Sequence, residues 1–146
     1  MTAADGFEAR VRDSFARQTA MATIGAGIAH LAAGEVDLRM PYSAELAQQH
    51  GFIHAGIIAA LADSACGYAA YTLMPPDAGV VSVEFKVNLM APAAGEWFVT
   101  RARVKKAGRT LTVCNADVFA LSAGAERLIA TMQATMMTLL DRGLAG

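Results

Sequence analysis

A long apolar segment in the middle of the chain is the feature that most limits its possible folds. From Ile53 to Leu73, apolar and small residues cover nearly every direction of a helical wheel, so a helix here has no polar face to turn toward water. Pro75 and Pro76 end it, because proline lacks a backbone N–H and disfavours helical geometry in the residue before it. The segment predicts a helix surrounded by protein.

The whole apolar run, from Phe52 to Met74, is not expected to insert into a membrane. It carries His54 and, near its middle, Asp63, and a carboxylate at a bilayer centre costs about 3 kcal/mol. The first thirteen residues hold five charges and lack the apolar core of a secretory signal. We therefore expect a cytoplasmic protein.

Composition narrows the classes further. The chain has 146 residues, the length of a single domain (1–146), and is 55% hydrophobic and 17% charged with a net charge of -1, which excludes disorder and charge-driven binding of nucleic acid. Cys66 and Cys114 are isolated, which favours two reduced core thiols over a redox pair. The three histidines have no Glu or Cys at a usual ligand spacing, so no metal site is expected.

The flanking segments predict an amphipathic helix and several strands. Phe7, Val11 and Phe15 have helical spacing, which predicts a helix within residues 1–23 that ends near Gly25. Residues 24–31 and 35–40 indicate a hairpin, and further strands are predicted at 81–89, 97–105, 110–120 and 128–140. In the first of these, Val81, Val83, Phe85, Val87 and Leu89 alternate with polar residues and should form one buried face. Residues 141–146 are expected to fray.

This order of elements predicts an α+β fold in which an antiparallel sheet of five to six strands wraps around one long central helix. The outer face of the sheet would still carry apolar residues such as Phe98, Val118 and Ile129. Exposed apolar faces and edge strands are usually covered by association. We therefore expect a homo-oligomer, at least a dimer.

Asp63 is the unusual residue of the central helix, since its near neighbours are all apolar or small. A buried, unpaired carboxylate costs several kcal/mol, and carboxylates in such settings concentrate at functional sites. The alternative is a structural carboxylate that is hydrogen-bonded to backbone amides or to Ser64.

The start of the same helix is a second candidate. The amides of Ala55 and Gly56 are among its first, unsatisfied N–H groups, where the helix dipole favours an oxyanion. The alternative is an ordinary helix start capped by His54. Asp63 follows His54 by nine residues, which places the two side chains roughly 13 Å apart along the helix and ~180° apart around it. If both serve one reaction, Asp63 must meet the helix start of a second copy.

The run from Gln48 to Gly67, QQHGFIHAGIIAALADSACG, resembles the central signature of hotdog-fold acyl-CoA thioesterases of the phenylacetate-degradation (PaaI-like) type. The similarity continues through residues 80–96 and 104–110. It implies a hotdog fold, a dimer or dimer of dimers with sites at the interface, and hydrolysis of an acyl-CoA without a further cofactor.

The resemblance also implies roles for single residues. Asp63 would be the general base or the nucleophile, the Ala55 amide would hold the oxyanion, and Gln48 would orient the carbonyl or water. Ser82 would lie near the carboxylate, and His54 would support the loop. The usual HGG of the family reads His54-Ala55-Gly56 here. If residue 55 needs a positive φ, the added methyl costs about 1 kcal/mol or displaces the donor.

Two further groups have both a functional and an ordinary interpretation. Five cations lie close together in the sequence: Arg101, Arg103, Lys105, Lys106 and Arg109. They could bind the phosphates of coenzyme A, or they could belong to the solvated end of a strand. Lys106 and Arg109 lie by the turn and are the more mobile candidates. An acyl tunnel or plain core could be formed by Phe52, Tyr68, Tyr71, Met132, Met136 and Met137.

Two rival functions stay open at this point. A non-catalytic protein that binds acyl-CoA would keep the fold and the basic residues but would have no use for a costly buried acid. A hotdog-fold dehydratase or hydratase would move a proton next to the carbonyl, but such sites resemble other motifs than the one from Gln48 to Asp63.

Overall fold

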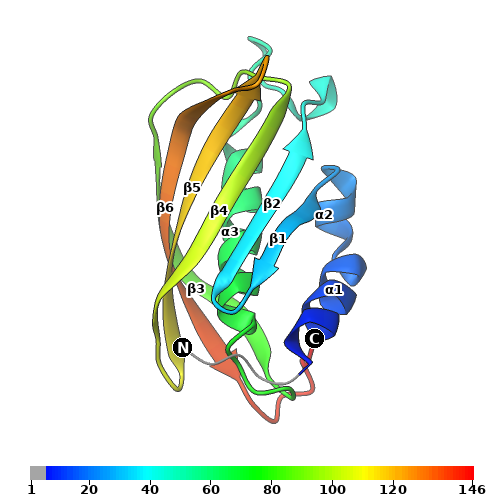
Figure 1. Ribbon diagram of the computed structural model, residues 1–146, viewed down its shortest axis with the longest axis vertical. Coiled ribbons are helices and arrows are strands. Elements are labelled where there is room, and N and C mark those ends of the chain that lie inside the picture. Colours follow the sequence, from blue (N-terminus) through cyan, green and yellow to red (C-terminus); the bar gives the residue numbers. More distant parts are fainter. Residues whose placement is uncertain (1–5) are drawn as a thin grey trace.

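Six antiparallel strands form one sheet that curves around the helix α3 in the computed structural model, which describes residues 6–146 (Figure 1). The helical elements are α1 (Phe7–Arg17), α2 (Thr19–Thr23), a 3-10 turn (Ala44–Leu46) and α3 (Ala55–Tyr71). The strands are β1 (Gly27–Ala32), β2 (Glu35–Pro41), β3 (Gly79–Leu89), β4 (Trp97–Ala107), β5 (Leu111–Ser122) and β6 (Ala125–Leu139), in the order β1-β2-β4-β5-β6-β3. The predicted α+β hotdog arrangement is confirmed.

The central helix is buried as its composition requires. Leu61, Ala62, Ala65 and Ala69 are fully buried, and the concave face of the sheet packs against them. The helix is two residues shorter at each end than predicted, because His54 caps its start and the chain turns before Pro75. Within residues 6–146 no helix is long and apolar enough to cross a membrane.

The amphipathic N-terminal helix is interrupted at Gln18. The prediction of one continuous helix is wrong, because Gln18 has an extended backbone (φ -80°, ψ 93°) that separates α1 from α2. The Gln18 side chain donates to the Tyr68 hydroxyl and accepts from the Ser64 hydroxyl, both on α3. The interruption therefore fixes the N-terminal helices against the central helix. Residues 1–5 of the predicted helix lie outside the described residues.

The expected outer face of the sheet is wrong for three residues. Phe98, Val118 and Ile129 are buried and not outward-facing, at 0%, 0% and 1% exposure. Many inner positions of β4 and β5 are alanines, such as Ala102 and Ala116, which let α3 approach the sheet closely. The inner face therefore carries large apolar residues and alanines together, and the three large residues belong to the core.

Strand β3 also differs from the expectation of one buried face. Val81, Val83, Phe85 and Leu89 are 39%, 51%, 43% and 54% exposed, and only Val87 is half-buried among the predicted five. The reason is the position of β3 at the edge of the sheet, where it pairs with β6 alone. An exposed edge strand with apolar side chains is a surface that proteins usually cover.

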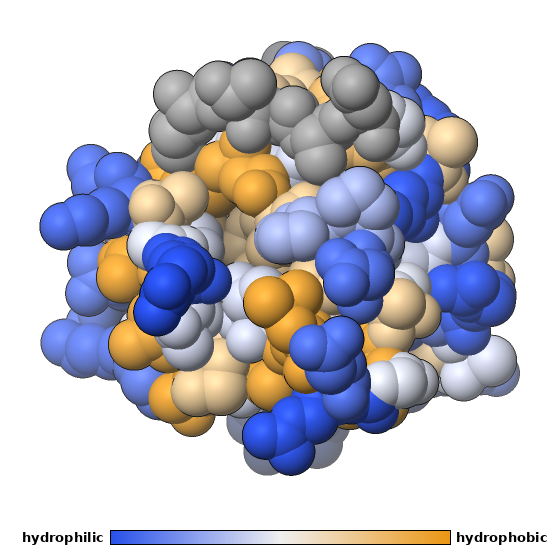
Figure 2. Space-filling view, turned by 90° about the horizontal axis from the view of Figure 1, so that it is seen from below, coloured by the Kyte–Doolittle hydropathy of each residue, from blue (hydrophilic) through white to orange (hydrophobic). Residues whose placement is uncertain are grey.

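Residues 141–146, which we expected to fray, are exposed and follow β6 back to α1 (Figure 1). The backbone oxygen of Gly146 accepts hydrogen bonds from Ser14 Oγ (2.6 Å) and Arg17 Nη2 (2.7 Å) on α1. Seen from this lower end of the molecule, apolar side chains lie near the centre of the face and along part of its margin, among hydrophilic ones (Figure 2).

Both cysteines are free, fully buried thiols, as predicted. The side-chain hydrogen bond with Cys114 and then burial raise the pKa of Cys66 well above its ordinary value. Because both side chains are fully buried and the reactive thiolate form of Cys66 is disfavoured, neither cysteine should react with iodoacetamide at pH 8 while the protein is folded. Mass spectrometry should find two labels per chain only after unfolding in denaturant, and rapid labelling of the native protein would contradict this packing.

Candidate functional site

Asp63 lies in the middle of α3 and lines a cavity of about 330 Å³. The carboxylate is half-buried and is not enclosed by apolar groups as its sequence neighbours suggested. Its Oδ1 accepts a hydrogen bond from Ser82 Oγ at 2.6 Å. Polar side chains from other segments, such as Ser14, Gln18 and Ser82, line the same cavity as Asp63.

Ser82 reaches Asp63 because of an irregularity in the sheet. In the β3–β6 ladder Ser82 pairs with Met136 and Glu84 pairs with Thr135, so Val83 is an extra residue in a β-bulge. Bulges bend a strand, re-aim its side chains and are frequent next to active sites. Here the bulge is adjacent to the serine whose side chain crosses to α3. The structure thus brings together Asp63 and Ser82, as the resemblance implied.

At the start of α3, the backbone N–H of Gly56 is hydrogen-bonded and that of Ala55 is not. His54 is the N-cap, and its Nδ1 accepts a hydrogen bond from the N–H of Gly56 at 2.8 Å. The capping interpretation is therefore confirmed for His54. The expectation that the Gly56 amide is unsatisfied is wrong, because His54 accepts its hydrogen bond. Within residues 6–146 the N–H of Ala55 has no hydrogen-bond partner. Ala55 has no positive φ, so its methyl causes no backbone strain.

Ala55 and Gln48 line a second cavity, of about 260 Å³, together with apolar residues such as Phe52 and Ile58. Gln48 Oε1 accepts hydrogen bonds from the backbone N–H groups of His50 and Phe52, which fixes the turn before α3. The Gln48 amide nitrogen has no partner within the described part of the chain. This second cavity therefore offers N–H donors beside the positive end of the helix dipole.

A single chain does not bring Asp63 and Ala55 together. Asp63 and Ser82 line one cavity, whereas Ala55 and Gln48 line the other. Asp63 follows Ala55 by eight residues, which separates them by roughly 12 Å along the helix axis. The acid and the amide cannot act on the same atom within a single chain.

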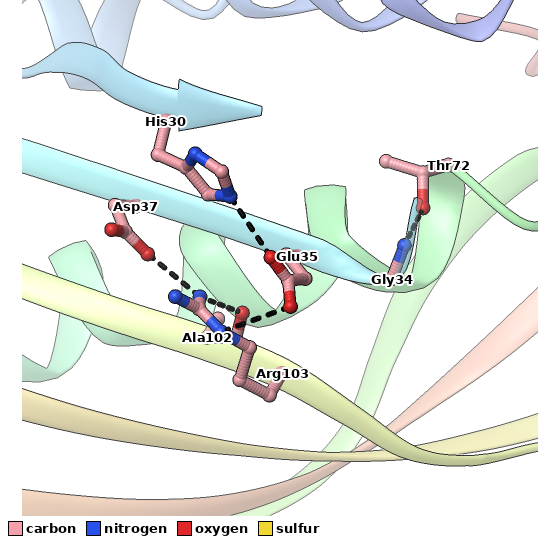
Figure 3. A network of polar contacts seen from close by, with 7 residues as sticks. All are labelled: His30, Gly34, Glu35, Asp37, Thr72, Ala102 and Arg103. Carbon is pink, nitrogen blue, oxygen red and sulfur yellow. Dashed lines mark hydrogen bonds and ion pairs between the residues drawn. The ribbon is translucent and has the colours of Figure 1, made fainter. Parts of the chain in front are cut away.

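Two of the predicted phosphate-binding cations, both on β4, are paired with acids on other strands of the sheet. Arg103 donates to Asp37 (2.7 Å) and lies 3.6 Å from Glu35, as Figure 3 shows. The hydrogen bond with His30 and the charge of Arg103 lower the pKa of Glu35. Arg101 forms an ion pair with Glu126. These acids lie on β2 and β6, so their proximity depends on strand pairing, which the sequence did not reveal.

Lys106 and Arg109 have no such partners. Both are exposed at the turn between β4 and β5, and within residues 6–146 neither forms an ion pair. Of the five cations named from the sequence, Lys105, Lys106 and Arg109 form no ion pair within residues 6–146, and the last two lie by the turn.

The aromatic and methionine residues divide between cavity and core. Tyr68 and Met136 line the cavity of Asp63, and Phe52 lines that of Ala55. Tyr71 and Met132 are core residues, at 1% and 2% exposure. Sequence reasoning missed Ser14 and Gln18, which reach the cavity of Asp63 from the N-terminal helices. No local pattern marked them, because their role depends on how α1 docks on α3.

Comparisons with known proteins agree with this fold. A crystal structure of a thioesterase family protein from Silicibacter pomeroyi is 58% identical, with a TM-score of 0.92 over 92% of this chain and 99% of that one. The PaaI protein of the phenylacetic acid degradation operon of Escherichia coli has a TM-score of 0.80 over 91% of this chain and 93% of its own. At 17% identity, it supports the fold alone.

A protein of Halobacterium salinarum named "Putative esterase VNG_1336C" is 31% identical over 100 residues. This match covers 65% of the chain and 66% of that protein, just under two thirds of its length. The family model of the thioesterase superfamily matches residues 50–125, just over half of the chain and the part that contains His54, Asp63 and Ser82. The chain therefore belongs to the thioesterase superfamily.

Proposed function

We propose that this protein hydrolyses an acyl-CoA thioester to free coenzyme A and a carboxylic acid. The observation that carries the proposal is the Asp63 carboxylate, which Ser82 holds by a hydrogen bond at the edge of a cavity of ligand size. Membership of the thioesterase superfamily supports the same reaction class.

The chemistry follows from the two cavities, one lined by Asp63 and the other by Ala55. A water oxygen attacks the thioester carbonyl carbon, the C–S bond breaks, and the proton that Asp63 removes from water ends on the thiolate. In the alternative route, an oxygen of Asp63 attacks the carbonyl carbon, the C–S bond breaks and the thiolate leaves. Water then hydrolyses the resulting anhydride, which restores Asp63 and supplies the proton that the thiolate takes up. Either route develops negative charge on the carbonyl oxygen, and the free N–H of Ala55 would stabilise it by about 3 to 4 kcal/mol.

Two copies are needed to complete such a site, because Asp63 and Ala55 line different cavities of one protomer. The exposed edge of β3, with Val81, Val83 and Phe85, is the surface on which a second copy would pack. A two-fold axis there would place Asp63 of each copy near the start of α3 of the other. Two equivalent sites would result.

Dimer formation through β3 can be tested by substitution. Phe85→Glu should convert the dimer into a monomer on a sizing column and remove activity with it, because a charge in an apolar interface opposes association. Leu111→Glu, on the exposed start of β5, is the matched control and should stay dimeric. A fully active Phe85→Glu monomer would contradict the shared site.

Lys106 and Arg109 are the residues that would contact the phosphates of coenzyme A, which is part of the substrate and not a separate cofactor.

The reaction itself is tested by measuring thiol release from acyl-CoA thioesters with different acyl groups. Release of one thiol per acid formed supports hydrolysis. Binding of acyl-CoA without turnover of any thioester would favour the non-catalytic rival, and water addition to an unsaturated acyl-CoA would favour the hydratase.

A further inference from the structure

The wall of the Asp63 cavity that α1 supplies is polar and carries a positive charge. Ser14, Arg17 and Gln18 line the cavity on this side, and Arg17 is the basic residue among the lining residues described in the structure. Within residues 6–146, Arg17 forms no ion pair with an acidic side chain. This part of the cavity wall thus presents a guanidinium whose partner in the structure is the oxygen of Gly146 and not an acidic side chain.

The hydrogen bonds of this wall determine which of its groups donate and which accept. The oxygen of Gly146 accepts only, so the hydroxyl of Ser14, 2.6 Å away, must donate its one hydrogen to it. The Tyr68 hydroxyl, 3.1 Å from Ser14 Oγ, must then donate to Ser14, and it accepts from Gln18 Nε2. Ser64 donates to Gln18 Oε1 and completes the chain.

In this series of hydrogen bonds, every donated hydrogen points toward the oxygen of Gly146. Successive hydrogen bonds of one direction polarise each other, which strengthens the last donor, the Ser14 hydroxyl. Arg17 Nη2 donates to the same oxygen at 2.7 Å, and a guanidinium can only donate. Two converging donors with a positive charge match a carboxylate oxygen.

In the structure, the oxygen of Gly146 lies at this point, in a segment that is exposed from residue 140 onward. A ligand oxygen could take its place, because an exposed segment is easily displaced. Tyr68, which anchors the donors, follows Asp63 by five residues on α3, roughly 7.5 Å along the axis. An acyl chain of a few methylenes spans such a distance.

We propose that Ser14 and Arg17 form a subsite for a distal carboxylate, so that the preferred substrates are thioesters of dicarboxylic acids. This proposal rests on the function proposed above, since it assigns the acyl group to the cavity of Asp63. Tyr68 and Gln18 act as positioning residues for the Ser14 hydroxyl.

Adipyl-CoA and hexanoyl-CoA, which have acyl chains of equal length, test the subsite. The wild type should hydrolyse adipyl-CoA with a kcat/KM at least about tenfold higher, since charge-assisted hydrogen bonds contribute on that scale. Arg17→Gln should reduce this preference about tenfold, and the exposed Arg17 can be replaced without disturbing the core. Arg12→Gln, an exposed arginine of the same helix outside the cavity, should leave the preference unchanged. Equal preference in wild type and Arg17→Gln would overturn the subsite.

Binding of the free acids separates this proposal from the hydrolytic one. Adipate should raise the melting temperature of the wild type more than hexanoate does, and Arg17→Gln should abolish the difference. If neither thioester is hydrolysed but adipate shows this selective effect, the proposed function fails and the subsite stands. Equal shifts with adipate and hexanoate would overturn the subsite whether or not thioesters are hydrolysed.

Discussion

Replacing Asp63 by Asn should lower kcat for acyl-CoA hydrolysis by at least ~100-fold, within the range for removal of a general base. Asn has nearly the same shape and can still accept the hydrogen bond from Ser82, so the cavity should keep its form. It cannot take a proton from water or form an anhydride. KM should therefore change much less than kcat, which steady-state thiol-release assays can separate.

The matched control is Asp117→Asn. Asp117 is an exposed carboxylate on β5 that accepts a hydrogen bond from Thr131 and lines neither cavity. The same chemical change there should leave kcat within about twofold of the wild type. If Asp63→Asn behaves like Asp117→Asn, the carboxylate has no part in the reaction.

Replacing Ala55 by Pro should cost about 10² to 10³ in kcat, the usual effect of removing one oxyanion donor. Proline is well tolerated at the first position of a helix, where it removes only an N–H that makes no intrahelical bond. The backbone of His54, with ψ at 135°, already suits a residue before proline. The substitution thus deletes the free amide and keeps the helix.

Ala55→Gly keeps the amide and serves as the control for the change of side chain. It should retain most of the wild-type kcat, and both variants should melt within a few degrees of the wild type. An Ala55→Pro protein that is folded and as active as Ala55→Gly would exclude this amide as the oxyanion donor.

Features that depend on local pattern could be predicted from the sequence. The central helix followed from the apolar run, and its end followed from Pro75 and Pro76. Asp63 stood out because a single charge interrupts that run, and the spacing from His54 indicated that one chain cannot unite both ends of the site. These inferences need only the helical period and the cost of burying charge.

Features that depend on pairing between distant segments could not be predicted in this way. The bulge at Val83, which aims Ser82 at Asp63, is a property of the β3–β6 ladder. The neutralisation of Arg103 by Asp37 depends on the pairing of β2 with β4. The docking of Gln18 on Tyr68 joins residues fifty positions apart. Strand register and helix docking decide these contacts, and neither leaves a local signal.

Mixing two inactive variants tests most directly whether one chain's carboxylate and another chain's amide form each site. Asp63→Asn and Ala55→Pro should be unfolded together in equal amounts and refolded, with each variant refolded alone as the control. A mixed dimer then has one site with both changes and one intact site, so activity should recover to about a quarter of the wild type. The shared site would be contradicted if mass spectrometry finds mixed dimers but the activity of the mixture stays at the mean of the activities of the two variants refolded alone.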